Sequence, residues 1–235
     1  KLRTHSADEF INWSGSLRFI PRSQVWPATE QAVCAYVRDA PARGRKIRVA
    51  GSGHSSSALV ETPDILMSMR DHRGLIDYDL TRHRATVGAG TVLHDLGQIL
   101  HGVGLGMQNL GDVDTQTIAG VIGTGTHGSG RKLPNISATL VGVRAITGQA
   151  DIVEWSIEEH PDLINAARVS MGLLGIFTAV RLQLEPTYRL RRREYCARTE
   201  DCLEHLDELA DAHRNFDFYW YPRRDEVKIR TLNPP

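Results

Sequence analysis

The chain has 235 residues, 28 basic and 28 acidic, so its formal charge is zero and nothing draws it as a whole to nucleic acid or anionic membranes. Its length suits one sizeable domain, or one domain and part of another, and no apolar run approaches the roughly 20 residues of a membrane span. Three cysteines, an odd number without zinc or redox spacing, favour reduced thiols in a cytoplasmic protein.

The first structural unit that the sequence predicts is a β-α-β unit. Arg22–Val25 is expected to form a short strand, after which Thr29 caps a helix that Pro41 ends. The apolar face of this helix consists of Val33, Tyr36, Val37 and Ala40. Lys46–Ala50 then reads as a buried strand that leads into a glycine-rich loop, a common ligand position.

The middle of the chain alternates further strands with helices. Strands are predicted at Asp64–Met69, Arg84–Val87, Leu140–Thr147, Ile152–Trp155 and Gly175–Leu184. Helices are predicted at Thr91–His101, Thr117–Ile122 and Pro161–Arg168. The first of these helices places Leu93, Leu96 and Leu100 on one face, and Gly148 marks the turn of a hairpin.

Composition changes after Pro186, where a second unit begins. Its strands are predicted at Tyr188–Ala197, Phe216–Tyr221 and Val227–Thr231, with a helix at Glu200–His213. The inward face of that helix is expected to hold Leu203, Leu206, Leu209 and Ala210, and Trp155 and Trp220 are expected in the core. These elements make too small a core to stand alone. We therefore expect one domain at residues 1–186 and the incomplete beginning of a second at residues 187–235.

Two glycine-rich segments are the most informative feature of the sequence. The first is Val49–Ser55, and the second runs from Gly111 through Gly120 to Gly130. Glycine lets backbone N–H groups approach a ligand closely and turn toward an anion. Two such loops predict a large anionic cofactor held from two sides, with a histidine in each loop able to reach it.

Several common sites are disfavoured by the same residues. The Gly51–Ser56 segment has serine where a Rossmann fingerprint needs its third glycine, and a Walker lysine is missing. His54 and His127 lack the helper spacing of a metal site, so no metal is expected. Asp112 and Asp114 lack the glycine and glutamate of a calcium loop, and no hydrolase elbow is present.

Together the two glycine segments resemble the flavin-binding motifs of the vanillyl-alcohol oxidase superfamily. They are most similar to its sugar-1,4-lactone and alditol oxidase branch, which includes gulonolactone oxidases. The resemblance extends to Asn12–Gly15, Pro27–Glu30, Gly172–Phe177 and Phe218–Pro222.

The resemblance implies an α+β fold: an FAD-binding domain of the p-cresol methylhydroxylase (PCMH) type, made of two α/β subdomains, followed by the start of an α+β substrate (cap) domain. It implies an FAD-linked oxidase that oxidises a CH–OH group of a sugar-derived lactone or polyol by hydride transfer to flavin N5, with oxygen as acceptor. Two alternatives remain open: a dehydrogenase of the same fold with another electron acceptor, and a non-catalytic flavin-binding protein that lacks its substrate domain.

On the same resemblance, His54 matches the position at which these oxidases bond the flavin through its 8α-methyl carbon; the alternative is a histidine that caps the turn or touches the ring. The other candidate cofactor-binding residues are Ala50, Gly51, Ser52, Gly53, Ser55, Asp112, Thr115, Gly120, Gly123, Thr124, Gly125, Thr126, His127, Gly175 and Ile176. His127 is expected to be a buried residue that fixes its loop, the alternative being direct catalysis, and Asp112 is expected to brace the loop. The branch's substrate-binding and proton-abstracting groups lie mainly in later segments absent from these residues, so we name no catalytic base.

Overall fold

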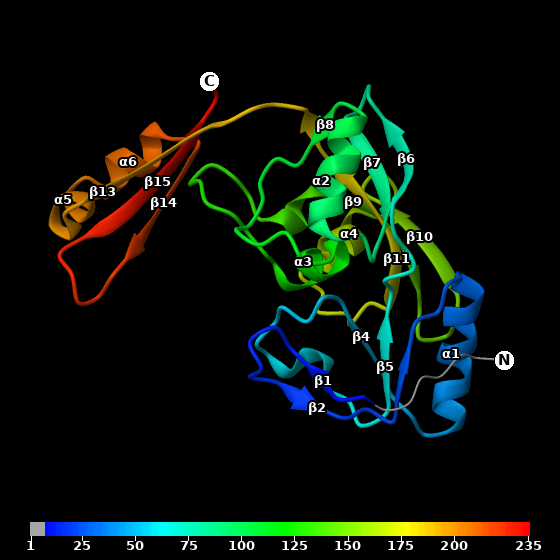
Figure 1. The fold of residues 1–235 in the computed structure, drawn as a ribbon. Helices are drawn as coiled ribbons and strands as arrows, with labels where there is room; N and C mark the ends of the chain where they lie inside the picture. The colour runs from blue at the N-terminus through cyan, green and yellow to red at the C-terminus, as the bar shows by residue number, and fades with distance from the viewer. Residues whose placement is uncertain (1–7) are drawn as a thin grey trace.

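The computed structural model describes residues 8–235, which form three regions (Figure 1). The lower region in the figure contains α1 and a small sheet, the upper region contains a larger sheet with three helices, and residues 187–235 form an arm beside the upper region. We call the lower and upper regions together the body. The first residues of the predicted first domain, 1–7, lie outside the described residues.

The lower region is the predicted β-α-β unit with one strand added. Its parallel sheet has the order β3 (Ser23–Val25), β5 (Ile65–Ser68), β4 (Ile47–Ala50). Helix α1 (Glu30–Ala42) begins where Thr29 Oγ1 accepts a hydrogen bond from the Ala32 N–H, and all four residues of its predicted apolar face are buried. The helix continues one residue past Pro41, since the fixed φ of proline suits a helix and the ring removes only one N–H donor near the end of the helix.

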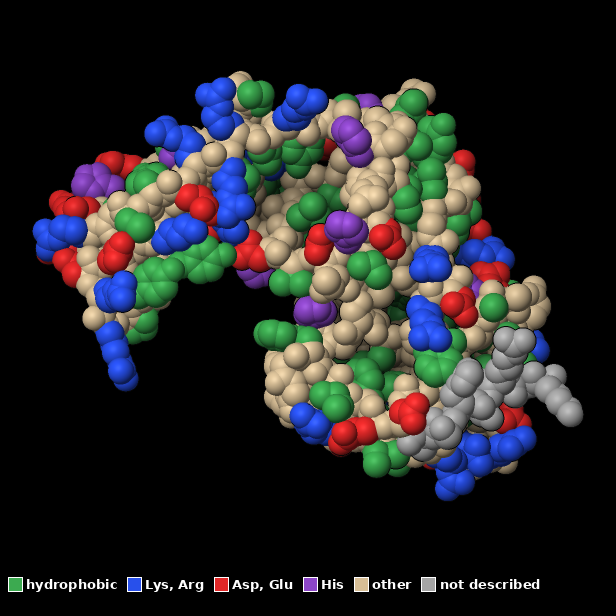
Figure 2. Space-filling view, viewed as in Figure 1, with side chains coloured by type: hydrophobic (Ala, Val, Ile, Leu, Met, Phe, Trp, Pro, Cys, Tyr) green, Lys and Arg blue, Asp and Glu red, His purple; other side chains and the backbone are tan. Residues whose placement is uncertain are grey.

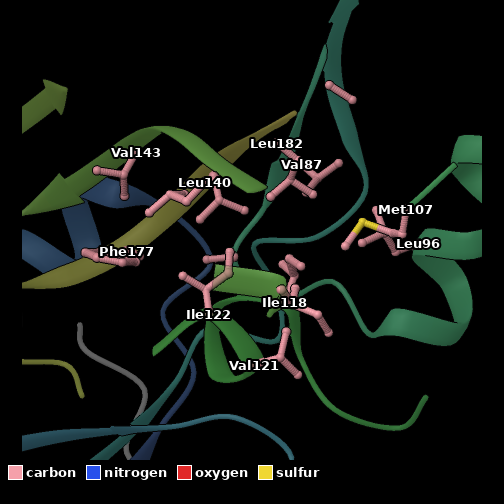
Figure 3. Packing of buried hydrophobic residues seen from close by; sticks show 14 of the residues in the cluster. Val87, Leu96, Met107, Ile118, Val121, Ile122, Leu140, Val143, Phe177 and Leu182 are labelled. Atoms are coloured by element: carbon pink, nitrogen blue, oxygen red, sulfur yellow. The ribbon is translucent and has the colours of Figure 1, made fainter. Parts of the chain in front are cut away.

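The upper region is built on a five-stranded antiparallel sheet. Its order is β10 (Ile152–Ser156), β9 (Leu140–Ile146), β11 (Ile176–Gln183), β7 (Arg84–Gly88), β6 (Leu75–Asp79). The helices are α2 (Leu93–Gly102), α3 (Ile118–Thr124) and α4 (Pro161–Ala167). Figure 3 shows Ile118, Val121 and Ile122 of α3 among the strand residues Leu140 and Phe177. The sequence did not predict β6, whose residues are mostly exposed and carry little apolar alternation.

The lower and upper regions are joined by an ion pair. Glu30 at the start of α1 accepts hydrogen bonds from Arg144 of β9 at 2.8 and 2.9 Å and from Thr178 of β11 at 2.7 Å. The hydrogen bonds from Arg144 lower the pKa of Glu30 more than its burial raises it.

The same two regions also meet main chain to main chain. A Cβ on Gly90 would lie 2.0 Å from the Met69 carbonyl oxygen, closer than atoms can approach. Only glycine fits at this crossing.

The arm is a separate three-stranded antiparallel sheet with two short helices. The sheet order is β13 (Arg191–Ala197), β15 (Val227–Asn233), β14 (Asn215–Trp220), and the helices are α5 (Thr199–Glu204) and α6 (Leu206–Ala212). The prediction of one continuous helix at 200–213 was wrong. The chain breaks at His205, which shifts the helical phase, so Cys202 is buried while Leu203 is 53% exposed. Trp220 was also wrongly placed in the core, since it is 59% exposed.

Short elements complete the chain. They are β1 (Phe10–Ile11) paired with β2 (Arg18–Phe19), β8 (Leu105–Gly106) paired with β12 (Glu185–Pro186), and the 3-10 helices η1 (Ala58–Val60) and η2 (Ile136–Thr139). The mixed α and β content confirms the predicted α+β class. Across residues 8–235, no helix has the length and apolar character needed to cross a membrane.

Candidate functional site

A cleft of about 450 Å³ lies between the lower and upper regions. This volume is within the roughly 300–1,000 Å³ range of pockets for small molecules and cofactors. Four segments supply most of its lining: residues 47–55 after β4, residues 116–124 of α3 and its approach, the turn after β9 at 146–148, and residues 170–177 before and in β11. The cleft therefore lies where both predicted glycine loops meet.

The first loop presents free backbone donors to the cleft. Among the described residues, no backbone N–H of residues 51–55 donates a hydrogen bond to the protein. Gly53 has φ of 71°, a conformation that favours glycine, and a Cβ there would lie 3.2 Å from the Phe10 ring. A series of unpaired N–H groups in such a turn forms a concave site for an anion.

The charged residues of the lining have one sign. Arg45, Arg48 and Arg70 line the cleft, and no aspartate or glutamate of the described chain does. The Arg70 guanidinium lies over the Trp26 ring at 4.1 Å. Because the whole chain has zero formal charge, this local excess of arginine singles out the cleft as a site for an anion.

The second loop touches the first directly. A Cβ on Gly51 would lie 2.3 Å from Thr117 Oγ1, so the two loops approach as closely as a missing side chain permits. Gly125, with φ of 71°, ends α3 in the left-handed conformation and donates its N–H to the Val121 carbonyl. Gly120, Gly123 and Thr124 line the cleft.

A third, strained wall precedes β11; Gly172–Phe177 was identified from the sequence, but residues 169–171 of this wall were missed. Val169 and Met171 have φ of 56° and 52°, a costly conformation for residues with side chains. The Met171 N–H donates to the Gly123 carbonyl, which docks this wall on α3. Ser170 is 8% exposed, lines the cleft, and its Oγ has no hydrogen-bond partner among the described residues. The nearby pair Gly172 and Gly175, at φ of 75° and 111°, was the available sequence signal.

His54 lines the cleft and is held between two side chains. Its Nε2 lies 2.7 Å from Thr115 Oγ1, and its ring stacks on Trp13 with 5.6 Å between centroids and 17° between planes. Thr115 lies just before α3, and Trp13 lies in the N-terminal turn. Two segments that are distant in sequence therefore hold the His54 ring.

The predicted site residues divide into two groups. Those that line the cleft are Ala50, Gly51, Ser52, Gly53, His54, Ser55, Gly120, Gly123, Thr124, Gly175 and Ile176. Those outside the lining are Asp112, Thr115, Gly125, Thr126 and His127. His127 is exposed rather than buried as expected, because its loop packs through Gly128 against Leu110 and leaves the imidazole outside, with Nδ1 donating to the Gly128 carbonyl at 2.9 Å.

Asp112 contacts the arm rather than its own loop. It accepts hydrogen bonds from Arg230 at 2.6 Å and from the Tyr219 hydroxyl at 3.1 Å. The Asp112 carboxylate raises the pKa of the Tyr219 phenol, because it stabilises the protonated donor. Within residues 8–235, no three histidine, cysteine, aspartate or glutamate side chains gather where they could hold a metal.

Comparison with protein families matches two family profiles to this chain. The profile described as FAD binding domain matches residues 21–156, and the profile described as D-arabinono-1,4-lactone oxidase matches residues 180–234. The first covers most of the body, including both glycine loops, and the second covers the end of the body and nearly all of the arm.

Several curated relatives have similar sequences. An L-gulono-1,4-lactone dehydrogenase of Mycobacterium tuberculosis is 35% identical over 94% of this chain and 51% of its own length. The bovine L-gulonolactone oxidase is 29% identical over 97% of this chain and 52% of its own length. A D-arabinono-1,4-lactone oxidase of Candida glabrata is 29% identical over 91% of this chain and 41% of its own length. The chain thus spans about half the length of the relatives it matches.

Solved structures show the same fold. A cholesterol oxidase from Brevibacterium sterolicum superposes with a TM-score of 0.89 over 100% of this chain and 48% of its own, at 18% identity. A solvent-stable cholesterol oxidase gives a TM-score of 0.89 at 17% identity, covering 100% of this chain and 49% of its own. At such identity the likeness concerns the fold alone, and it confirms the predicted PCMH-type architecture.

Proposed function

Because this chain belongs to the family of FAD binding domains, we propose that it holds FAD in the cleft and serves an enzyme that oxidises a CH–OH group of a sugar-1,4-lactone or a polyol. The relatives, which are named as a gulonolactone oxidase, a gulonolactone dehydrogenase and an arabinonolactone oxidase, support this substrate class. The lactone oxidase profile over residues 180–234 supports it independently.

The observation that carries the proposal is the combination of free N–H groups and arginines in a cleft without acidic residues. FAD carries a pyrophosphate, which needs donors and positive charge; the loop at residues 51–55 offers the N–H donors, and Arg48, which also lines the cleft, offers the charge. The orphaned hydroxyl of buried Ser170 needs a polar partner that the described protein does not provide. These features fit the cofactor.

The chain's own residues would hold FAD from three sides. The backbone of residues 51–55 binds the phosphates, Thr124 and the glycines of α3 line a second side, and Ser170, Gly175 and Ile176 line a third. When bound, FAD supplies the acceptor, at N5, for a hydride from the substrate's carbinol carbon. The close approach of Gly90 to the Met69 carbonyl holds the two walls together at one point.

We propose that His54 bonds covalently to the 8α carbon of FAD. Its place in the cleft lining and the two side chains that hold its ring support this, since an oriented neutral imidazole is a competent nucleophile. Attachment would prevent loss of the cofactor and raise its reduction potential.

Dioxygen is the electron acceptor in this proposal, as the relatives named oxidases suggest. A dehydrogenase with another acceptor is the second candidate, because the Mycobacterium tuberculosis relative, at 35% identity, carries that name. The rate at which dioxygen reoxidises the reduced protein separates the two.

We also propose a domain boundary and a location. Residues 1–186 form the FAD-binding domain and residues 187–235 begin the substrate domain, as the separate sheet and small core of the arm suggest. The three cysteines are free, with Cys34 and Cys202 buried, which suits the reducing cytoplasm.

The test is to express the full-length protein, record its visible spectrum, and mix it anaerobically with aldonolactones and alditols. We expect a flavin spectrum that bleaches with at least one lactone. Absence of bound flavin would refute the cofactor proposal, and bound flavin that no lactone or polyol bleaches would refute the activity. His54→Ala should bind flavin but leave a colourless acid precipitate, whereas the parent protein leaves a yellow one.

A further inference from the structure

We propose that Thr115 is a positioning residue. Its hydroxyl accepts a hydrogen bond from the Nε2–H of His54 and so orients the imidazole while His54 becomes attached to FAD. The inference rests on the proposed covalent bond at His54. It assigns a role to a residue outside the cleft lining, from a contact 61 residues apart in sequence.

The contact itself is short and has no competitor. Thr115 Oγ1 and His54 Nε2 are 2.7 Å apart, and among the described residues neither side chain has another hydrogen-bond partner. A threonine hydroxyl can both accept and donate. When Nε2–H donates to Thr115, the lone pair resides on Nδ1, so the hydroxyl selects Nδ1 as the nucleophilic nitrogen.

Thr115 is held in place from both sides by α2. The N–H groups of His94 and Leu93 donate to the carbonyls of Asp114 and Gln116 at 2.8 and 2.9 Å. The His94 Nδ1–H also donates to the Asp114 carboxylate at 2.9 Å. The backbone on each side of Thr115 is therefore anchored, and its hydroxyl presents a fixed position to the imidazole.

His54 is anchored in the same manner by the N-terminal turn. The Trp13 N–H donates to the Gly53 carbonyl at 3.0 Å, and the Asn12 side-chain amide donates to the Ser55 carbonyl at 3.1 Å. Stacking on Trp13 fixes the plane of the imidazole. The hydrogen bond to Thr115 fixes the orientation of the ring within that plane. Such preorganisation of a nucleophile is what attachment requires.

The bond-forming step uses both ring nitrogens: Nδ1 forms the bond, and Nε2 loses the proton. Nδ1 would form a bond to the 8α carbon while one C–H bond of that carbon breaks and its proton passes to water, and the substituted imidazole would then carry a positive charge. That charge would be relieved when Nε2 gives its proton to water beside Thr115, after which the threonine hydroxyl would donate to Nε2. Two protons and two electrons leave overall, and dioxygen takes them, forming hydrogen peroxide.

A matched control exists elsewhere in the chain. Thr187 Oγ1 lies 3.1 Å from His101 Nδ1, so a second threonine hydroxyl contacts a histidine, but outside the cleft. Thr187→Val removes the same chemical group from the same kind of contact.

The experiment follows covalent incorporation in the full-length protein, prepared without flavin and then mixed with FAD. Intact mass and flavin retained after acid precipitation are measured against time. We expect Thr115→Val to attach FAD about tenfold more slowly, the effect of losing one hydrogen bond in the bond-forming step. Thr115→Ser, which keeps the hydroxyl, and Thr187→Val should attach it at the parent rate.

Binding is separated from attachment by a second pair of variants. His54→Ala and the double variant His54→Ala with Thr115→Val should bind FAD with the same Kd, since Thr115 lies outside the lining. Unequal Kd values, or attachment by Thr115→Val at the parent rate, would overturn the positioning role and leave the proposed function standing. Parent protein that binds FAD but never attaches it would overturn both this role and the covalent bond.

Discussion

The body and the arm are held together by different forces. In the upper region of the body, fully buried aliphatic side chains such as Leu140 and Ile122 join helices and sheet in one cluster (Figure 3), and a second buried cluster fills the lower region. The arm has three buried apolar residues, Cys202, Val227 and Ile229. Apolar burial therefore stabilises the body, while the arm needs something else to fix its position.

Polar contacts with the loops at residues 107–131 fix the position of the arm on the body. Arg214 donates to the Gln108 carbonyl at 2.8 Å, Asn215 donates to the Ser129 carbonyl at 2.8 Å, and Arg230 pairs with Asp112. Figure 2 shows an open recess between the arm and the lower region, so the arm meets the body mainly on one side. Directional hydrogen bonds thus orient the arm relative to the loop that also carries Thr115.

The largest effect is expected in the core of the body. Leu140→Ala should lower the free energy of unfolding by about 3–5 kcal/mol, because the residue is fully buried and its truncation leaves a cavity in a packed cluster. Ile229→Ala in the arm should mainly speed hydrogen exchange in β13–β15, since a small core opens locally. Denaturant unfolding and hydrogen exchange measure the two. Equal global losses would show that the arm and body unfold as one unit.

A smaller effect is expected where the lower and upper regions join. Glu30→Gln should lower the free energy of unfolding by about 1–3 kcal/mol, as for hydrogen bonds to a charged group. Because the pKa of Glu30 lies below its ordinary 4.5, this contribution is complete above pH 4.5 and is lost as pH falls through the lowered pKa. The parent and variant curves should converge in acid. A difference that does not change with pH would contradict this account.

The contact between Asp112 and the arm should matter for orientation more than for stability. Asp112→Asn should change the free energy of unfolding by less than about 1 kcal/mol, since the carboxylate is largely exposed. It should nevertheless increase hydrogen exchange in β15, where Arg230 lies. Asp114→Asn is the control, because it makes the same charge change in the same loop without touching the arm. Identical exchange in both variants would remove Asp112 from the junction.

The smallest effect is expected from Arg131, which pairs with Asp207 and Asp211 of α6. All three side chains are well exposed, so Arg131→Gln should change the free energy of unfolding by less than about 0.5 kcal/mol. Thermal unfolding measures it. A loss near that of Glu30→Gln would mean that surface charge, and not the carbonyl contacts of Arg214 and Asn215, holds the arm.

Local sequence patterns predicted most of the body. The β-α-β unit, the buried faces of α1 and α2, and the meeting of the two glycine loops at one cleft were all confirmed. The first two features depend on neighbours within a few residues, and the first glycine loop was expected at the cleft because it follows a buried strand. The resemblance supplied the FAD family, which the matched profile confirms.

What the sequence could not predict depends on contacts between distant residues. The partner of His54 lies 61 positions away, and the strain at Val169 and Met171 exists because that wall docks on α3. The break at His205 was missed because the apolar spacing through Leu203 and Leu206 suits a continuous helix. Trp220 was predicted in the core, but it lies on β14, a strand of the arm, and its side chain is exposed.

The crossing of the backbone at Gly90 and Met69 holds the lower and upper regions close together beside the cleft. Since main chain abuts main chain there, with a carbonyl oxygen 2.0 Å from where a Cβ would stand, the spacing of the two walls is fixed by peptide geometry and not by side-chain size. We therefore expect a substitution of Gly90 to disturb the junction of the two regions more than a substitution of a lining side chain does. At this point the separation of the two regions depends on the peptide backbone and not on which side chains surround it.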